Sequence, residues 1–264
     1  ATATGVQQMI TTTLSWIAGK VNGKLLNGNA DTQVLAVSTD TRTIESGAVY
    51  LALKGPNFNG HDFIEAAENA GASAVIASEN VTTSLPVISV EDTKEALGLL
   101  GAAVKQHIAP KTIAITGSSG KTTVKEMCAA ILARRGNVLA TNGNFNNDIG
   151  VPLTLLRLQE EHKYAVVELG ANHPGEIAYT TDLVKPDVAI LNNVSAAHVE
   201  GFGSLHGVAR AKTEIFRGVS SQGTAITPRD SEFYPCWERA CADMKWKSFG
   251  LTDNADVYAS DVVL

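Results

Sequence analysis

The sequence contains few cysteines, and they are not arranged in pairs. Cys128, Cys236 and Cys241 form no Cys-x-x-Cys motif, and their number is odd. Neither a disulfide framework nor a cysteine zinc site is therefore indicated. A reducing compartment fits this composition best, so we expect a cytoplasmic protein.

Long apolar runs and basic clusters are also absent. No stretch approaches the roughly 20 apolar residues that a membrane span requires. The net charge of −6 and the pI near 5.5 argue against a nucleic-acid-binding surface, because phosphate backbones demand clustered Lys and Arg. With 264 residues, of which 44% are apolar and 18% charged, the chain is typical of globular proteins and long enough for two domains.

One motif dominates what is present. Residues 111–127 read as an apolar strand, a Gly-rich turn and the start of a helix. Gly117 and Gly120 allow a sharp turn whose N–H groups point at one anion, Lys121 supplies a positive charge, and Thr122 offers a hydroxyl for Mg²⁺. The pattern predicts a phosphate-binding loop for a nucleoside triphosphate. Its nucleotide-binding candidates are Gly117, Ser118, Ser119, Gly120, Lys121, Thr122 and Thr123.

The loop is shorter than the strict phosphate-loop pattern, because Ile115 stands five residues before Gly120. The alternative is an ordinary Gly/Ser turn before a helix. The order of strand, turn, Lys-Thr and helix favours the phosphate-binding interpretation.

The apolar pattern predicts an α/β fold with a mostly parallel sheet in the second domain. Short apolar runs at residues 164–169, 188–191 and 224–226 are typical of strands buried in such a sheet. After the turn, five apolar residues are spaced as one helix stripe facing a sheet: Val124, Met127, Cys128, Ile131 and Leu132.

A smaller α/β domain is expected before it. Strands are predicted at 34–38, 49–53 and 74–77, with a helix at 61–70 between the last two. A further helix follows the cluster Glu91-Asp92-Thr93, reaches about Ile108 and is broken by Pro110. We place the domain boundary near residue 90, giving domains 1–90 and 91–264, and expect residues 1–8 to be an added remnant.

Five segments carry a resemblance to the Mur ligase family. They are residues 116–123, 143–152, 168–173, 192–204 and 211–216, and they follow in the order seen in that family. The resemblance covers nearly all of residues 9–264. It includes Asp40-Thr41-Arg42 and Gly60-His61-Asp62-Phe63, which look like the family's UDP-sugar domain.

The resemblance implies an activity. The segments Gly143–Asp148 and Glu168–Asn172 are similar to those of family members that join D-alanyl-D-alanine to UDP-N-acetylmuramoyl-tripeptide in peptidoglycan synthesis. Such enzymes use ATP and Mg²⁺ to form an acyl phosphate, which the incoming amine attacks.

We expect the protein to be a monomer. Two alternatives stay open: a non-catalytic nucleotide-binding module, and a sibling ligase acting on another carboxylate, such as a folate or another peptide stem.

The resemblance also assigns roles to individual residues. Lys121, Glu168, His198 and Lys212 would be catalytic, and Thr122, Glu168, His198 and carbamylated Lys212 would hold metal. Asn193 would contact the nucleotide. Taken alone, each of three residues would more often have an ordinary role. Glu168 would be a solvated residue at a strand end, His198 a loop histidine and Lys212 a surface lysine. The candidate substrate-binding residues are Asp40, Thr41, Arg42, Gly60, His61, Asn144, Asn146 and Asn147.

Two departures from the family pattern stand out. The family has Asn-Ala-Asp after the strand at 224–226, whereas this sequence has Pro228-Arg229-Asp230, and proline has no amide side chain for adenine. The chain also ends at Leu264, before the family's third domain, which closes over the site. We therefore expect this chain, assayed alone, to be inactive.

Overall fold

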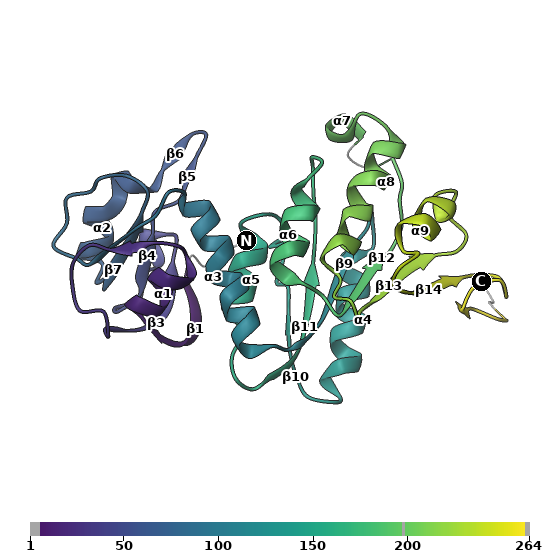
Figure 1. The fold of residues 1–264 in the computed structure, drawn as a ribbon, viewed down its shortest axis with the longest axis horizontal. Helices are drawn as coiled ribbons and strands as arrows, with labels where there is room; N and C mark the ends of the chain where they lie inside the picture. Colours follow the sequence, from purple (N-terminus) through teal and green to yellow (C-terminus); the bar gives the residue numbers. More distant parts are fainter. Residues whose placement is uncertain (1–5, 197–198, 262–264) are drawn as a thin grey trace. The chain divides into compact units, whose positions relative to one another are not determined.

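The computed structural model describes residues 6–196 and 199–261 (Figure 1). The chain divides into two compact units. The first comprises Ala1–Ile108 and Leu155–Glu160, and the second comprises Ala109–Thr154 and Glu161–Leu264. The division falls after Ile108 rather than near residue 90, because the helix Thr93–Ile108 packs against the first helix, Leu14–Lys20.

The first unit is built on a six-stranded sheet of order β1-β3-β4-β7-β8-β2. Its four central strands run parallel, and β1 and β2 are antiparallel edges. The elements are β1 Val6–Thr13, α1 Leu14–Lys20, β2 Lys24–Leu25, β3 Gln33–Ser38, η1 Thr41–Thr43, β4 Val49–Leu51, β5 Lys54–Gly55, β6 Phe58–Asn59, η2 Gly60–Phe63, α2 Ile64–Asn69, β7 Ala74–Ala77, β8 Val87–Ser89 and α3 Thr93–Ile108.

The strands predicted at 34–38, 49–53 and 74–77 are confirmed as β3, β4 and β7. The predicted helix at 61–70 begins as the 3₁₀ turn η2 and continues as α2. Residues 6–8, expected to be a remnant, belong to strand β1, where Val6 pairs with Ser38 and Gln8 with Ala36.

The second unit is built on a seven-stranded sheet of order β10-β11-β9-β12-β13-β14-β15, in which every bonded pair is parallel. The predicted α/β class with a mostly parallel sheet is confirmed. The elements are β9 Lys111–Thr116, α4 Lys121–Ala133, β10 Asn137–Ala140, α5 Gly150–Leu156, β11 His162–Glu168, α6 Glu176–Val184, β12 Val188–Leu191, α7 Val199–Phe202, α8 Leu205–Thr213, η3 Glu214–Gly218, β13 Thr224–Pro228, α9 Tyr234–Ala240, β14 Lys245–Gly250 and β15 Val257–Tyr258.

The topology of this sheet fixes where a ligand can bind. From β9 the chain crosses through α4 to β10 on one side, whereas from β12 it continues to β13 on the other side (Figure 1). Right-handed crossovers then put α4 and α6 on opposite faces of the sheet. The order reverses between β9 and β12, and open α/β sheets bind ligands at the carboxyl ends of the strands flanking such a reversal.

Helix α4 presents only part of the stripe that its apolar residues predict. Val124, Cys128 and Leu132 are half-buried, whereas Met127 and Ile131, also expected to face the sheet, are 60% and 66% exposed. Lys125 is instead the buried residue, with 2% of its side chain accessible. The helix is rotated because Lys125 has an acceptor inside the unit, the Thr141 carbonyl, 2.7 Å from its Nζ.

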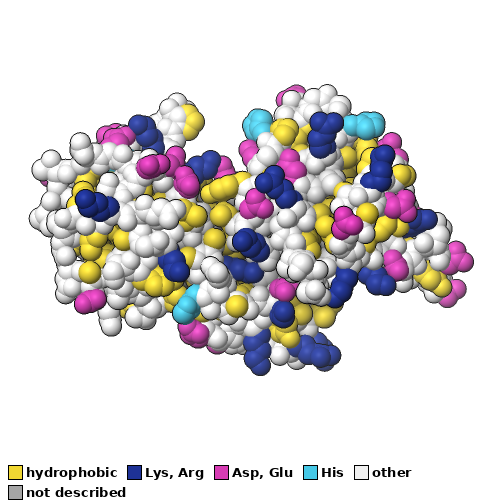
Figure 2. Space-filling view, viewed as in Figure 1, with side chains coloured by type: hydrophobic (Ala, Val, Ile, Leu, Met, Phe, Trp, Pro, Cys, Tyr) yellow, Lys and Arg dark blue, Asp and Glu magenta, His cyan; other side chains and the backbone are white. Residues whose placement is uncertain are grey.

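No helix within the described residues is long and apolar enough to cross a membrane. Figure 2 shows Lys and Arg side chains interspersed with Asp and Glu over the face in view. That distribution agrees with the sequence-based argument against a nucleic-acid surface.

Candidate functional site

The loop after β9 has the conformation that phosphate binding requires. Gly120 has a φ of 71°, in the left-handed region, and caps the start of α4. A Cβ on Gly117 would lie 3.0 Å from the Cβ of Asn192, so the loop also needs glycine there for close approach to the end of β12. The first N–H groups of α4 have no acceptor within the helix and are available to an anion.

Two asparagines after β12 hold this loop in shape. The Ser119 N–H donates to Asn193 Oδ1 at 3.0 Å, and the Ser118 N–H donates to the Asn193 carbonyl at 3.1 Å. Asn192 and Asn193 both donate from Nδ2 to the Ser119 carbonyl, at 2.8 and 3.1 Å. Asn193 was expected to contact the nucleotide, and in this structure its side chain bonds the loop itself.

Lys121 folds back over the loop. Its Nζ donates to the Gly117 carbonyl at 2.9 Å, so the ammonium lies against the backbone of the loop. The Ser118 hydroxyl is tied to Ser195, accepting from its N–H at 2.9 Å. The loop therefore presents one cation and a set of helix-start amides at the switch point of the sheet.

Glu168 ends β11 next to this loop. Its Oε2 accepts from the Thr122 hydroxyl at 3.0 Å, and its Oε1 accepts from Asn146 Nδ2 at 2.9 Å. Only 3% of the residue is exposed. The sequence analysis paired Thr122 and Glu168 as metal ligands, and the structure brings them together.

The surroundings of Glu168 fit a divalent cation. Both donors to its carboxylate are neutral, and no ion pair to it is formed by residues 6–196 or 199–261. Buried carboxylates are normally paired or bound to a metal, and hydroxyl and carboxylate oxygens suit Mg²⁺. The Thr116 hydroxyl, directly before the loop, is buried without a partner in the described part of the chain.

A site with three clustered His, Cys, Asp or Glu ligands is not formed by the residues that the structure describes. His198, expected to hold a second metal ion, lies outside the described residues.

Lys212, in α8, is buried with 2% of the residue exposed. Burial, and secondly the positive charge of Lys121, lower the pKa of its amine from 10.5 to about 8. Most of the amine is still protonated near pH 7, but its neutral fraction is much larger than that of an ordinary lysine, and the neutral amine is the form that reacts with CO₂. The surface-lysine alternative raised from the sequence is wrong for this residue.

The amide-rich loop after β10 has internal roles. Asn146 donates to Glu168, as described, and Asn147 Oδ1 accepts from the Gly150 N–H at 2.7 Å, which caps α5. The Asn144 carbonyl accepts from the Asn146 N–H at 2.7 Å. These three residues were expected to bind substrate, and the structure leaves that role a proposal.

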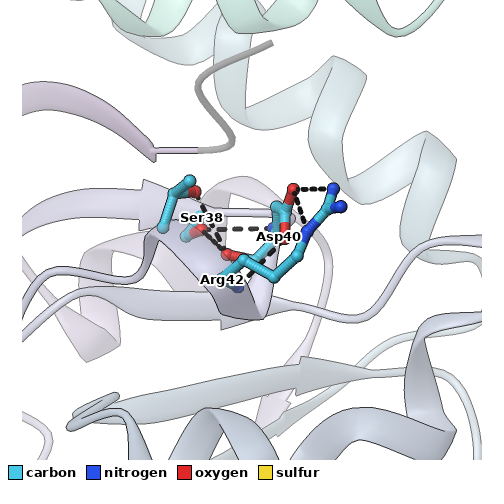
Figure 3. A network of polar contacts seen from close by, with 4 residues as sticks. Ser38, Asp40 and Arg42 are labelled. Carbon is cyan, nitrogen blue, oxygen red and sulfur yellow. Dashed lines mark hydrogen bonds and ion pairs between the residues drawn. The ribbon is translucent and has the colours of Figure 1, made fainter. Parts of the chain in front are cut away.

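In the first unit, Asp40 and Arg42 form a bidentate pair (Figure 3). Arg42 Nη2 lies 2.6 Å from Asp40 Oδ2, and the Asp40 carboxylate also accepts from the Arg42 backbone N–H at 3.0 Å. The hydrogen bond from Arg42 lowers the pKa of Asp40. The Arg42 side chain is 85% exposed, so Asp40 orients a guanidinium that Thr41 and the rest of η1 present to solvent.

Gly60 and His61 occupy structural positions in the same unit. A Cβ on Gly60 would lie 2.6 Å from the Leu53 carbonyl oxygen, and the Gly60 N–H donates to that oxygen. His61 Nδ1 lies 2.7 Å from Asn59 Oδ1, and its Nε2 accepts from the Ser78 N–H at 3.0 Å. Both ring nitrogens are used, and burial lowers the pKa of the ring, so the imidazole is neutral.

Residues 228–230, where the sequence departs from the family pattern, make contacts with strand β14 and with the residues around it. Pro228 ends β13 opposite Phe249. The guanidinium of Arg229 lies 4.0 Å from the centre of the Tyr234 ring, and Tyr234 stacks on Trp246 at 4.8 Å. Asp230 Oδ2 accepts from the Leu251 N–H at 2.8 Å.

Sequence reasoning missed three residues at the site: Lys125, Thr141 and Asn192. A lysine one turn beyond the phosphate loop has the spacing of an inward-facing residue, since Lys121 and Lys125 are four apart. That spacing was the available signal. Nothing in the sequence singled out Thr141.

Comparison with known proteins gives a consistent result. The Mur ligase middle domain matches residues 115–264, and the catalytic domain of the Mur ligase family matches residues 33–109. The UDP-N-acetylmuramoyl-tripeptide–D-alanyl-D-alanine ligase of Escherichia coli K12 is 48% identical over 255 residues, which are 96% of this chain and 56% of that protein. The chain thus spans little more than half the length of such relatives.

Solved structures agree with this. A crystal structure of MurF from Acinetobacter baumannii superposes with a TM-score of 0.92 at 39% identity, covering 97% of this chain and 57% of that one. The MurF ligase of Thermotoga maritima in complex with ADP superposes with a TM-score of 0.79 at 32% identity, covering 85% of this chain and 52% of that one. The chain belongs to the Mur ligase family.

Proposed function

We propose that this chain is the substrate- and ATP-binding part of a ligase that joins D-alanyl-D-alanine to UDP-N-acetylmuramoyl-tripeptide in peptidoglycan synthesis. Two relatives that carry this activity in their names are 48% identical over 255 residues and 50% identical over 228 residues of the alignment. The observation that carries the proposal is the pairing of Thr122 and Glu168 beside the phosphate loop.

The proposed reaction has two steps. A carboxylate oxygen of the tripeptide attacks the γ-phosphorus of ATP, the bond from that phosphorus to the bridging oxygen breaks, and ADP leaves. The neutral amine of D-alanyl-D-alanine then attacks the acyl carbon of the acyl phosphate, inorganic phosphate leaves, and the amine loses a proton. Charge neutralisation on the phosphoryl oxygens is the main demand of the first step.

The chain's own residues answer that demand. Lys121 and the amides at the start of α4 would hold the β- and γ-phosphates. Thr122 and Glu168 would hold one Mg²⁺, and His198 and a carbamylated Lys212 a second, and bound Mg²⁺ would draw charge off the phosphoryl oxygens. The lowered pKa of Lys212 supports carbamylation, because the neutral amine is the reactive form.

The first unit would bind the UDP part of the substrate. The exposed guanidinium of Arg42, fixed by Asp40, suits a diphosphate, because arginine donates in a planar fork. Thr41, Gly60 and His61 would contribute through the loop geometry, and Asn144, Asn146 and Asn147 would contact the sugar and peptide part. We further propose that the protein is a cytoplasmic monomer.

The experiment is nucleotide binding by calorimetry. We predict that Lys121→Ala reduces ADP affinity by at least about 30-fold, in line with about 2–5 kcal/mol for removing one partner of a buried charge pair. The control is Lys111→Ala, because Lys111 begins β9 at the opposite edge of the same sheet and is paired with Asp187. Equal ADP affinity for Lys121→Ala and wild type would exclude the phosphate-loop role.

Titration with UDP-N-acetylmuramoyl-tripeptide separates the proposed ligase from the alternatives. Saturable binding that is weakened by Arg42→Ala supports the ligase. Binding of ADP without any binding of the muropeptide would favour a nucleotide-binding module or a sibling ligase.

A further inference from the structure

The hydrogen bonds at the end of strand β10 depart from the regular pattern of a parallel sheet, because a side-chain oxygen replaces a backbone carbonyl as acceptor. Ala140 lies opposite Val166, and the Thr141 N–H donates to the Val166 carbonyl at 3.1 Å. In an evenly spaced parallel ladder, the next bond would run from the Glu168 N–H to the Thr141 carbonyl. The Glu168 N–H instead donates to the Thr141 hydroxyl, at 2.9 Å.

The Thr141 carbonyl, which the Glu168 N–H leaves without a donor, accepts a hydrogen bond from Lys125. The Lys125 Nζ donates to this carbonyl at 2.7 Å, and it also contacts Glu126 Oε1 at 2.8 Å. Thr141 and Lys125 are both almost completely buried, at 1% and 2% exposure. A buried ammonium is costly unless its hydrogen bonds are made, so this contact sets the rotation of α4 on the sheet.

Lys125, Thr141 and Glu168 therefore link helix α4 to strand β11, the two elements that carry the candidate metal ligands. Lys125 lies on α4, one turn after Thr122, and Glu168 ends β11. Through Thr141, the helix that carries the Thr122 hydroxyl and the strand that carries the Glu168 carboxylate are fixed to one another. We propose that Thr141 and Lys125 are positioning residues that set the geometry of Thr122 and Glu168 for a divalent cation.

This inference rests on the proposed function, because it takes Glu168 as a metal ligand. The chemical basis is general: groups that orient metal ligands without touching the metal alter metal affinity by about 10- to 100-fold when removed. If Thr141 and Lys125 had only a structural role, replacing them would lower the stability of the fold and would weaken metal binding and nucleotide binding alike. The two affinities must therefore be measured apart.

The test uses the 264-residue chain, ADP and Mn²⁺ as a spectroscopic substitute for Mg²⁺. Free Mn²⁺ is measured by electron paramagnetic resonance in the presence of ADP, and ADP affinity is measured separately in EDTA. We expect Thr141→Val to weaken Mn²⁺ binding to the ADP complex about 10- to 100-fold. ADP affinity in EDTA should stay within about twofold of wild type, because Thr141 is not part of the phosphate loop.

Four further variants complete the design. Thr141→Ser keeps the hydroxyl and should restore Mn²⁺ affinity, and Lys125→Met should reproduce the loss if it folds. Thr180→Val is the matched control, because Thr180 is a buried threonine of α6 whose hydroxyl bonds the Glu176 carbonyl. Glu168→Gln tests the ligand itself.

The outcomes separate the inference from the proposed function. Wild-type Mn²⁺ affinity in Thr141→Val, with a clear loss in Glu168→Gln, would overturn the positioning role and leave the metal role of Glu168 intact. Wild-type Mn²⁺ affinity in Glu168→Gln would overturn both. An equal loss in Thr180→Val would show a general effect of stability and would also count against the proposal.

Discussion

At the scale of single residues, buried lysines mark the site more clearly than any other feature. Lys125 and Lys212 are both about 2% exposed, whereas lysine is almost never fully buried without a partner. Lys125 has a carbonyl acceptor, and Lys212 has a pKa lowered to about 8. Lys125 thus has a defined hydrogen-bond acceptor, whereas Lys212 loses its proton more readily than an exposed lysine does.

We predict that Lys212→Met stabilises the fold at pH 7. The unfolded amine titrates near 10.5 and the folded amine near 8, so the unfolded state binds more protons between these values and wild-type stability rises with pH across that window. The gain should be about 3 kcal/mol at pH 7 and should shrink by pH 10. Urea denaturation in CO₂-free buffer at both pH values measures it. A variant less stable than wild type at pH 7 would contradict the prediction.

A second prediction concerns Gly60. A Cβ there would lie 2.6 Å from the Leu53 carbonyl oxygen and 2.9 Å from the Leu53 nitrogen, and backbone atoms cannot rotate away. We expect Gly60→Ala to cost about 1–3 kcal/mol in free energy of unfolding. Gly19→Ala is the control, since nothing lies within 4 Å of its Cβ position in helix α1, and it should be neutral or stabilising. Equal stability of the two variants would refute the steric argument.

At the scale of elements, the sequence predicts what depends on local pattern. Strands β3, β7, β9, β11 and β12 follow from short apolar runs, and the phosphate loop follows from two glycines and a Lys-Thr pair. The rotation of α4 does not follow from its apolar residues, because the only signal for an inward-facing Lys125 is its four-residue spacing from Lys121, and its acceptor lies on a distant segment. Contacts between segments far apart in the chain, such as Asn193 with Ser119, leave no periodic trace in the sequence.

We predict that Asn193→Ala loosens the phosphate loop. The change removes the acceptor of the Ser119 N–H and the donor to the Ser119 carbonyl and hydroxyl. ADP affinity should fall about tenfold, which corresponds to the net worth of about one or two hydrogen bonds. Amide hydrogen exchange at residues 117–120 should speed up in parallel. Asn137→Ala, at the exposed start of β10, is the control, and a similar loss there would point to a non-specific effect.

At the scale of the whole molecule, the site residues fall into two groups that belong to separate units. Asp40, Arg42 and Gly60 lie in the first unit, and the phosphate loop with Glu168 and Lys212 lies in the second. The sequence indicated two domains with a boundary near residue 90, whereas the two compact units divide after Ile108. The helix between these two positions could belong to either domain as far as its sequence shows. Only the packing of α3 against α1 assigns it.

We predict that the 264-residue chain binds ADP but makes no peptide bond. This chain spans 56% of its relative from Escherichia coli, and we expect the orientation of the amine to depend on the part of such relatives that these 264 residues do not match, an effect worth about 7–11 kcal/mol in well-oriented reactions. Incubation with UDP-N-acetylmuramoyl-tripeptide, ATP, Mg²⁺ and D-alanyl-D-alanine should give at most slow phosphate release. Detection of the pentapeptide product by mass spectrometry at an enzymatic rate would contradict this.

The two units are not consecutive in the chain, and this affects synthesis on the ribosome. Residues Leu155–Glu160 belong to the first unit, where Glu160 lies 3.4 Å from His107. They emerge up to 52 residues after Ile108, a delay of roughly 3–10 s at about 5–20 residues per second. During that interval the first unit lacks a segment while β9, α4 and β10 are already leaving the ribosome. The first unit therefore gains its last segment only after part of the second unit has been synthesised.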